Sequence, residues 1–134
     1  MNVVHAHPPN IDQIDVVFHV KQRHGIYYTY GDTIYNPSGV EISPALKAHE
    51  GVHYDRQTND PAKIDAWWDK YLVDPEFRLA EELAAHQVEY KVYCGYVKDR
   101  NRQHRMLIGI AQRLAGPLYG NLLSATKARK LIAA

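Results

Sequence analysis

Three polar–proline pairs constrain the fold of this chain more than any other feature. Ser43-Pro44, Asp60-Pro61 and Asp74-Pro75 each place a capping side chain directly before a proline. Proline fits the first position of a helix, where its missing N–H costs no hydrogen bond, and the preceding Ser or Asp can cap the free amides. The pairs therefore predict three successive helices, the first covering about residues 44 to 58 and the third being long.

The segments on either side of these helices predict a small sheet and further helices. We expect the following elements: a short strand at 2–7, a helix capped by Asn10 that ends before Gly25, a hairpin of 26–30 and 33–35 turning at Gly31-Asp32, a helix at about 101–115, and a last one from Ser124. A small β-hairpin or three-stranded sheet followed by several helices is an α+β fold. Trp67 and Trp68 are adjacent on a helix, so we expect one of them to be partly exposed.

Composition indicates one folded domain covering residues 1–134. The chain is 46% hydrophobic and 23% charged, which is ordinary for a globular protein. A net charge of +1 gives no reason to expect a nucleic-acid or membrane partner. The basic run from Lys98 to Arg105 is interpreted as a solvated helix start in preference to a phosphate-binding patch.

The chain has neither a secretory signal nor an apolar run that approaches the roughly 18 residues a membrane span needs. We therefore expect a cytoplasmic location. Its one cysteine, Cys94, cannot form an internal disulfide and is expected to be a buried thiol.

The predicted helix at 44–58 carries the pattern His49-Glu50-Gly51-Val52-His53. Residues four apart share one helical face, so His49 and His53 can present two imidazole nitrogens to one metal ion at about 2.0–2.1 Å. Glu50 lies about 100 degrees further round the helix, which suits a base acting on a metal-activated water. The competing interpretation is an amphipathic helix with incidental histidines.

A catalytic zinc ion needs a third protein ligand and an open position for water. On the helix after Asp74, Glu82, His86, Glu89 and Tyr93 form a polar stripe, whereas Glu81 falls in the apolar sector. The stripe favours Glu82 as the third ligand, with Glu81 and His86 as alternatives. We interpret Glu89 and Tyr93 as ordinary surface or rim residues.

These segments resemble the small zincin-like peptidase domains of phages and bacteria. The similar runs are Ala48–Gln57, Asp74–Arg78 and Glu82–His86, with a weaker likeness in the tail from Leu114 to Gly120 and the helix after it, so the resemblance covers roughly residues 26 to 132. In those domains the second helix carries an arginine, a glutamate four positions on, a small residue and an aromatic. Here these positions are Arg78, Glu82, Ala85 and His86, the last being a departure from the usual aromatic.

The resemblance implies a zinc metallopeptidase of the gluzincin type, with Zn²⁺ held by His49, His53 and Glu82 and a peptide or protein as substrate. Glu50 would take a proton from the water that attacks the peptide carbonyl. His86 is the first candidate for stabilising the oxyanion, and Tyr90 or Tyr93 the second. In zincins the substrate usually pairs with a sheet edge, for which we expect Thr33 to Asn36.

Two other functions fit the same residues. The chain could be a non-catalytic structural or assembly module, for example a self-assembling phage-particle component associated with virions, in which zinc only stiffens the fold. It could also be a regulatory enzyme with one protein target. Glu50 favours catalysis, because a purely structural site needs no general base.

Overall fold

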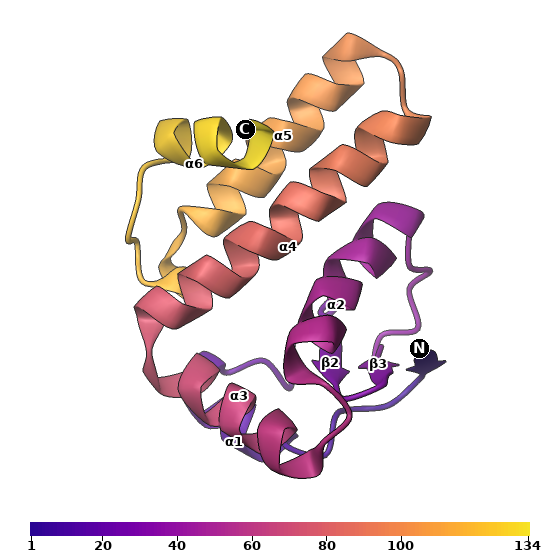
Figure 1. The fold of residues 1–134 in the computed structure, drawn as a ribbon, viewed down its shortest axis with the longest axis vertical. Coiled ribbons are helices and arrows are strands. Elements are labelled where there is room, and N and C mark those ends of the chain that lie inside the picture. The colour runs from indigo at the N-terminus through magenta and orange to yellow at the C-terminus, as the bar shows by residue number, and fades with distance from the viewer.

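The computed structural model describes all residues from 1 to 134 and confirms an α+β fold with six helices and a three-stranded sheet (Figure 1). The elements are β1 (Asn2–Val4), α1 (Ile11–Phe18), β2 (Tyr28–Tyr30), β3 (Thr33–Tyr35), α2 (Pro44–Gln57), α3 (Pro61–Val73), α4 (Pro75–Tyr96), α5 (Arg100–Leu114), the 3₁₀ turn η1 (Pro117–Tyr119) and α6 (Ala125–Ala133). None of the helices is both long and apolar enough to cross a membrane.

The three predicted helix starts are confirmed. Ser43 Oγ accepts a hydrogen bond from the Leu46 amide at 3.2 Å, and Asp60 and Asp74 cap α3 and α4 in the same way. Asn10 precedes α1 as predicted, but its side chain makes no capping bond, so that part of the prediction is wrong. The start of α5 is solvated as expected, because the basic side chains there are exposed.

The sheet has the order β1-β3-β2, with β1 parallel and β2 antiparallel to β3. The N-terminal strand pairs Asn2 with Thr33 and Val4 with Tyr35, so β3 is the central strand. The prediction that Thr33–Asn36 is a free edge is therefore wrong. A substrate cannot pair with β3, because its backbone groups already bond on both sides.

The core consists of two separate apolar clusters. The first joins α1, the sheet and α3, and the second joins α5 to α6. Trp67 and Trp68 both belong to the first cluster, so the predicted exposure of one tryptophan is wrong. Their indole N–H groups donate to Glu81 and to the Thr29 carbonyl, and these bonds allow both rings to be buried. Cys94 is only half-buried, contrary to the prediction.

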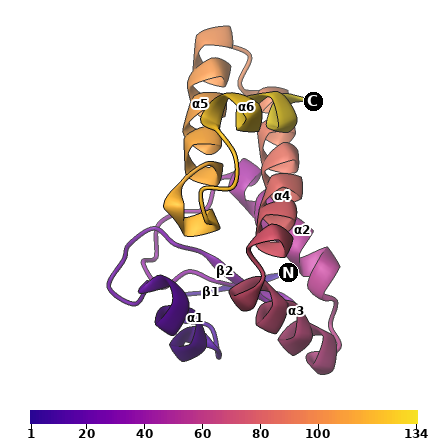
Figure 2. The same cartoon turned by 90° about the vertical axis from the view of Figure 1, so that its left-hand side faces the viewer.

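Helix α4 lies between the two halves of the molecule, with α2 and α3 on one side and α5 and α6 on the other (Figures 1 and 2). The most extensive packing of any pair of elements is that of α2 on α4. Side chains that meet at this contact are buried but polar, and they include His49, His53, Glu82 and Glu89. Buried polar groups need partners, and these side chains find most of theirs in one another.

Candidate metal centre

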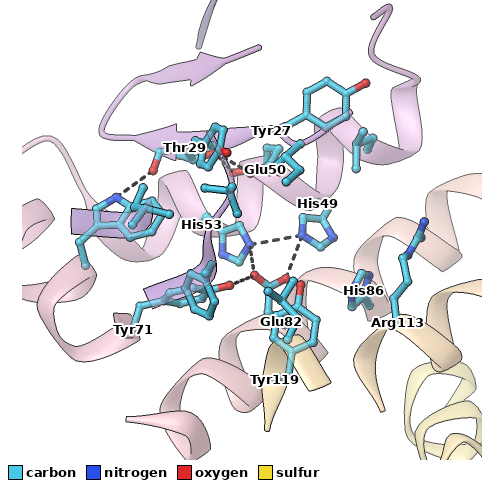
Figure 3. A pocket seen from close by; sticks show the side chains of 18 of the residues that line it. Tyr27, Thr29, His49, Glu50, His53, Tyr71, Glu82, His86, Arg113 and Tyr119 are labelled. Atoms are coloured by element: carbon cyan, nitrogen blue, oxygen red, sulfur yellow. Dashed lines mark hydrogen bonds and ion pairs between the residues drawn. The ribbon is translucent and has the colours of Figure 1, made fainter. Parts of the chain in front are cut away.

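Two histidines of α2 and one glutamate of α4 meet in a buried triangle (Figure 3). The two Nε2 atoms of His49 and His53 are 3.3 Å apart. Glu82 completes the triangle, with Oε2 at 3.1 Å from His49 Nε2 and Oε1 at 3.3 Å from His53 Nε2. His49 and His53 are four residues apart on α2, so their imidazoles share one face of the helix, and that face contacts α4.

The dimensions of the triangle fit a metal ion. Ligands bound tetrahedrally at about 2.0–2.1 Å lie about 3.3 Å from one another, which is close to the distance between the two Nε2 atoms and to the distance from each Nε2 atom to one of the two Glu82 oxygens. Glu82 Oε2 is buried and accepts no hydrogen bond, although a buried carboxylate oxygen normally does. His49, His53 and Glu82 could therefore hold a cation, as the sequence predicted for these three residues.

Electrostatics at the triangle also favour a cation. Burial would lower the pKa of His49, but the adjacent carboxylates of Glu82 and Glu89 outweigh it and raise that pKa to about 10. Burial would likewise raise the pKa of Glu82, yet the adjacent imidazoles of His53 and His49 hold it well below its usual value. The carboxylates around His49 thus require a neighbouring positive charge, which a proton or a metal ion can supply.

Side chains behind the triangle orient its members. His49 Nδ1 lies 2.8 Å from Glu89 Oε1, and the Tyr71 hydroxyl donates to Glu82 Oε1 at 2.6 Å. A histidine that donates Nδ1–H to a carboxylate presents the Nε2 lone pair to a metal ion. Both contacts therefore prepare the triangle for binding.

Glu89 is 2% exposed, so its interpretation as a surface or rim residue is wrong. Glu89 follows Glu82 by seven positions, so both lie on the same helical face. The polar stripe was predicted from this same periodicity. Burial would raise the pKa of Glu89, but hydrogen bonds with His49 and His86 lower it to about 2. Glu89 is therefore an ionised acceptor for both histidines.

Glu50 faces the same cavity as the triangle and is also buried. Its Oε2 accepts a hydrogen bond from Thr29 Oγ1 of β2 at 2.7 Å. Burial raises the pKa of Glu50, while the neighbouring His49 and His53 partly oppose that rise. A carboxylate whose proton affinity is raised, next to a cation site, has the properties of a general base.

The two alternative ligands lie outside the triangle. Glu81 accepts a hydrogen bond from Trp67 Nε1 at 2.9 Å and forms an ion pair with Arg56. His86 places Nδ1 at 3.0 Å from Glu89 Oε1, its ring centroid is 4.6 Å from that of His49, and its Nε2 is buried without a partner. His49, His86 and Glu89 form a second group close enough to hold a metal ion, but its atoms are already hydrogen-bonded to one another.

The cavity beside the triangle has a volume of about 350 Å³. Tyr90 and Tyr93, the second candidates for stabilising an oxyanion, do not line it, whereas Tyr71 and Tyr119 do. Apolar side chains make up much of its wall: Ile14, Phe18, Val20, Ile26, Leu46, Trp67, Trp68 and Leu118. Thr29, Tyr71 and Tyr119 were not identified from the sequence.

No known protein family matches the chain, and no curated protein or solved structure matches it. The geometry of the buried site is therefore the basis for assigning a function.

Proposed function

We propose that this protein is a zinc-dependent peptidase of zincin-like architecture, in which His49, His53 and Glu82 bind the metal. The observation that carries the proposal is the buried triangle of these residues with Glu50 in the same cavity. Two imidazoles and one carboxylate are a common ligand set of catalytic zinc, which keeps one position open for water or substrate. A purely structural zinc site is usually closed by four protein ligands.

A bound zinc ion would polarise the scissile carbonyl and lower the pKa of a water molecule toward about 7. Glu50 takes one proton from the attacking water as the water oxygen bonds to the carbonyl carbon. When the carbon–nitrogen bond breaks, Glu50 returns this proton to the leaving amine. The hydrogen bond from Thr29 Oγ1 to Oε2 of Glu50 holds the Glu50 carboxylate in its orientation toward the cavity.

The carbonyl oxygen gains negative charge and needs a hydrogen-bond donor. Tyr119, which lines the cavity and lies beside Glu82 in Figure 3, is the better-placed candidate. Burial and the nearby Glu82 raise the pKa of its hydroxyl, which therefore keeps its proton. His86, the candidate from the sequence, lines the same cavity. Burial lowers the pKa of His86, and neutral His86 that donates Nδ1–H to Glu89 would have only a lone pair on Nε2.

An extended substrate would pass the outer edge of β2, since β3 is central. The Thr29 carbonyl already accepts hydrogen bonds from Gln57 Nε2 and Trp68 Nε1, so pairing there is blocked. Residues 25 to 28 precede this point and line the cavity. We propose that they contact the substrate backbone.

A structural or assembly role is the second candidate function, and the site also supports it. A metal ion in the triangle would join α2 to α4, the most extensively packed pair of helices, and would stabilise the fold. Under this structural hypothesis the protein would associate with a phage particle or with further copies of the chain. Under the peptidase hypothesis it would be a cytoplasmic enzyme. Glu50 distinguishes the two, because only catalysis depends on its carboxylate.

The test compares the parent protein with Glu50→Gln, each loaded with one equivalent of zinc, on a mixed peptide library read by mass spectrometry. We expect the parent to cleave and Glu50→Gln to keep its zinc but lose about 10²- to 10⁴-fold in rate. Glu41→Gln, an exposed glutamate just before α2, is the matched control and should cleave like the parent. A parent protein that binds zinc without cleaving any peptide would favour the structural role, and one that binds no zinc would exclude both.

A further inference from the structure

A second cavity, of about 650 Å³, adjoins the catalytic one, and its charged side chains are all arginines. It lies between the end of α1 with the loop after it and the segment from the end of α5 through η1. Three arginines line it, Arg23, Arg78 and Arg113, together with Gln112 and no aspartate or glutamate. The catalytic cavity, in contrast, contains Glu50, Glu82 and Glu89.

The positive charge of these arginines is largely unneutralised. No carboxylate oxygen lies within 4.0 Å of Arg23 or Arg78, and the nearest one to Arg113 is Glu89 Oε2 at 3.9 Å. Buried charges are normally paired, so an arginine that is 6% exposed without a carboxylate partner is unusual.

Arg78 has neutral partners only. Its Nε and one Nη donate to the carbonyls of Tyr71 and Leu72, and its guanidinium lies 4.7 Å from the centre of the Phe18 ring. These contacts hold the end of α3 in place and fix the guanidinium at the cavity wall. The carbonyls carry only partial charges, so the cavity remains attractive to an anion.

The two cavities share four lining residues, namely Phe18, Arg113, Leu118 and Tyr119. These side chains lie at the boundary of the two cavities, so a peptide bound in the catalytic cavity lies next to the arginine-lined one. The guanidinium groups of the second cavity would attract a substrate carboxylate.

We propose that the arginine cavity binds a carboxylate of the peptide substrate, either an acidic side chain or the C-terminal carboxylate. The proposal depends on the peptidase function proposed above and names the substrate class it would select. Guanidinium groups suit this ligand, because their planar N–H donors match the two oxygens of a carboxylate. The cavity thereby fixes the position of the peptide relative to Glu50 and the metal ligands.

Arg23 and Arg113 are the residues to change, because both are exposed and their loss should leave the fold intact, whereas Arg78 also supports α3. The matched control is Arg105→Gln, an exposed arginine of α5 that lies outside both cavities. The test uses Glu50→Gln protein loaded with zinc, so that bound peptides are not cleaved.

Binding is measured by fluorescence anisotropy with fluorescein-labelled octapeptides of alanine and leucine in three forms. One carries an internal glutamate and a C-terminal amide, one a free C-terminal carboxylate, and one neither. We expect at least one acidic form to bind about tenfold more tightly than the neutral peptide. Which form binds identifies the source of the carboxylate.

Arg23→Gln combined with Arg113→Gln leaves Arg78 as the one arginine of the cavity and should weaken this preference severalfold, whereas Arg105→Gln should retain it in full. Equal binding of all three peptides, no binding of any peptide, or a preference that is undiminished in the double variant would each overturn the proposal. Cleavage by the parent protein is measured separately. Cleavage without a carboxylate preference removes only the arginine site, whereas a preference in a protein that cleaves nothing removes only the peptidase function.

Discussion

The contact between Glu89 and His49 gives a quantitative prediction for metal affinity. Glu89 Oε1 lies 2.8 Å from His49 Nδ1 and the carboxylate is buried. Glu89→Gln keeps the size of the side chain and one acceptor oxygen but removes the charge. A hydrogen bond to a charged group stabilises by about 1.5–3 kcal/mol and a neutral one by about 0.5–1.5 kcal/mol, so the variant should lose about 1.4 kcal/mol of zinc binding, which is about tenfold in Kd.

The assay is competition for zinc against a chromophoric chelator at fixed pH and salt. Glu76→Gln is the matched control, because Glu76 is exposed at the start of the same helix and should leave the Kd unchanged. A Glu89→Gln protein that is folded and binds zinc within twofold of the parent would refute the orienting role. Complete loss of zinc would instead assign the metal to the second group, formed by His49, His86 and Glu89.

Three further variants separate the roles of neighbouring side chains. Tyr71→Phe removes the hydroxyl that donates to Glu82 and should weaken zinc binding about fivefold in the same competition, whereas an unchanged Kd would contradict this role. Thr29→Val removes the donor to Glu50 and should slow peptide cleavage about tenfold with zinc affinity unchanged; a parallel loss of zinc would show that Thr29 supports the fold instead. Glu81→Gln weakens the hydrogen bond from Trp67 Nε1 and the contact with Arg56. It should lower the free energy of unfolding in urea by about 1–3 kcal/mol and leave zinc affinity unchanged. A loss of zinc affinity equal to that of Glu82→Gln would make Glu81 a ligand.

Local signals in the sequence predicted the helices and the triangle. Each polar–proline pair specifies its own helix start, since the cap and the missing amide act within a few residues. Helical periodicity alone then favoured Glu82 over Glu81, and the two carboxylates do face different partners. These conclusions needed no knowledge of how the helices pack.

Several of the wrong predictions concerned contacts between distant segments, whereas the missing Asn10 cap is a local signal that failed. Pairing of Asn2–Val4 with β3 joins residues about thirty positions apart, and no local pattern indicates which side of a hairpin such a strand will occupy. Burial of Glu89 depends on the packing of α2 against α4. Thr29 and Tyr71 reach the site from β2 and α3, so helical spacing could not identify them.

The most direct test of the metal site is X-ray absorption at the zinc edge, measured on the protein loaded with one equivalent of zinc. We expect a four-coordinate ion with two imidazole nitrogens at about 2.0–2.1 Å and a carboxylate oxygen at about 2.0–2.2 Å. His53→Ala should remove one imidazole from the spectrum. A sulfur ligand at about 2.3 Å, which only Cys94, Met1 or Met106 could supply, or a spectrum without imidazole, would contradict the account.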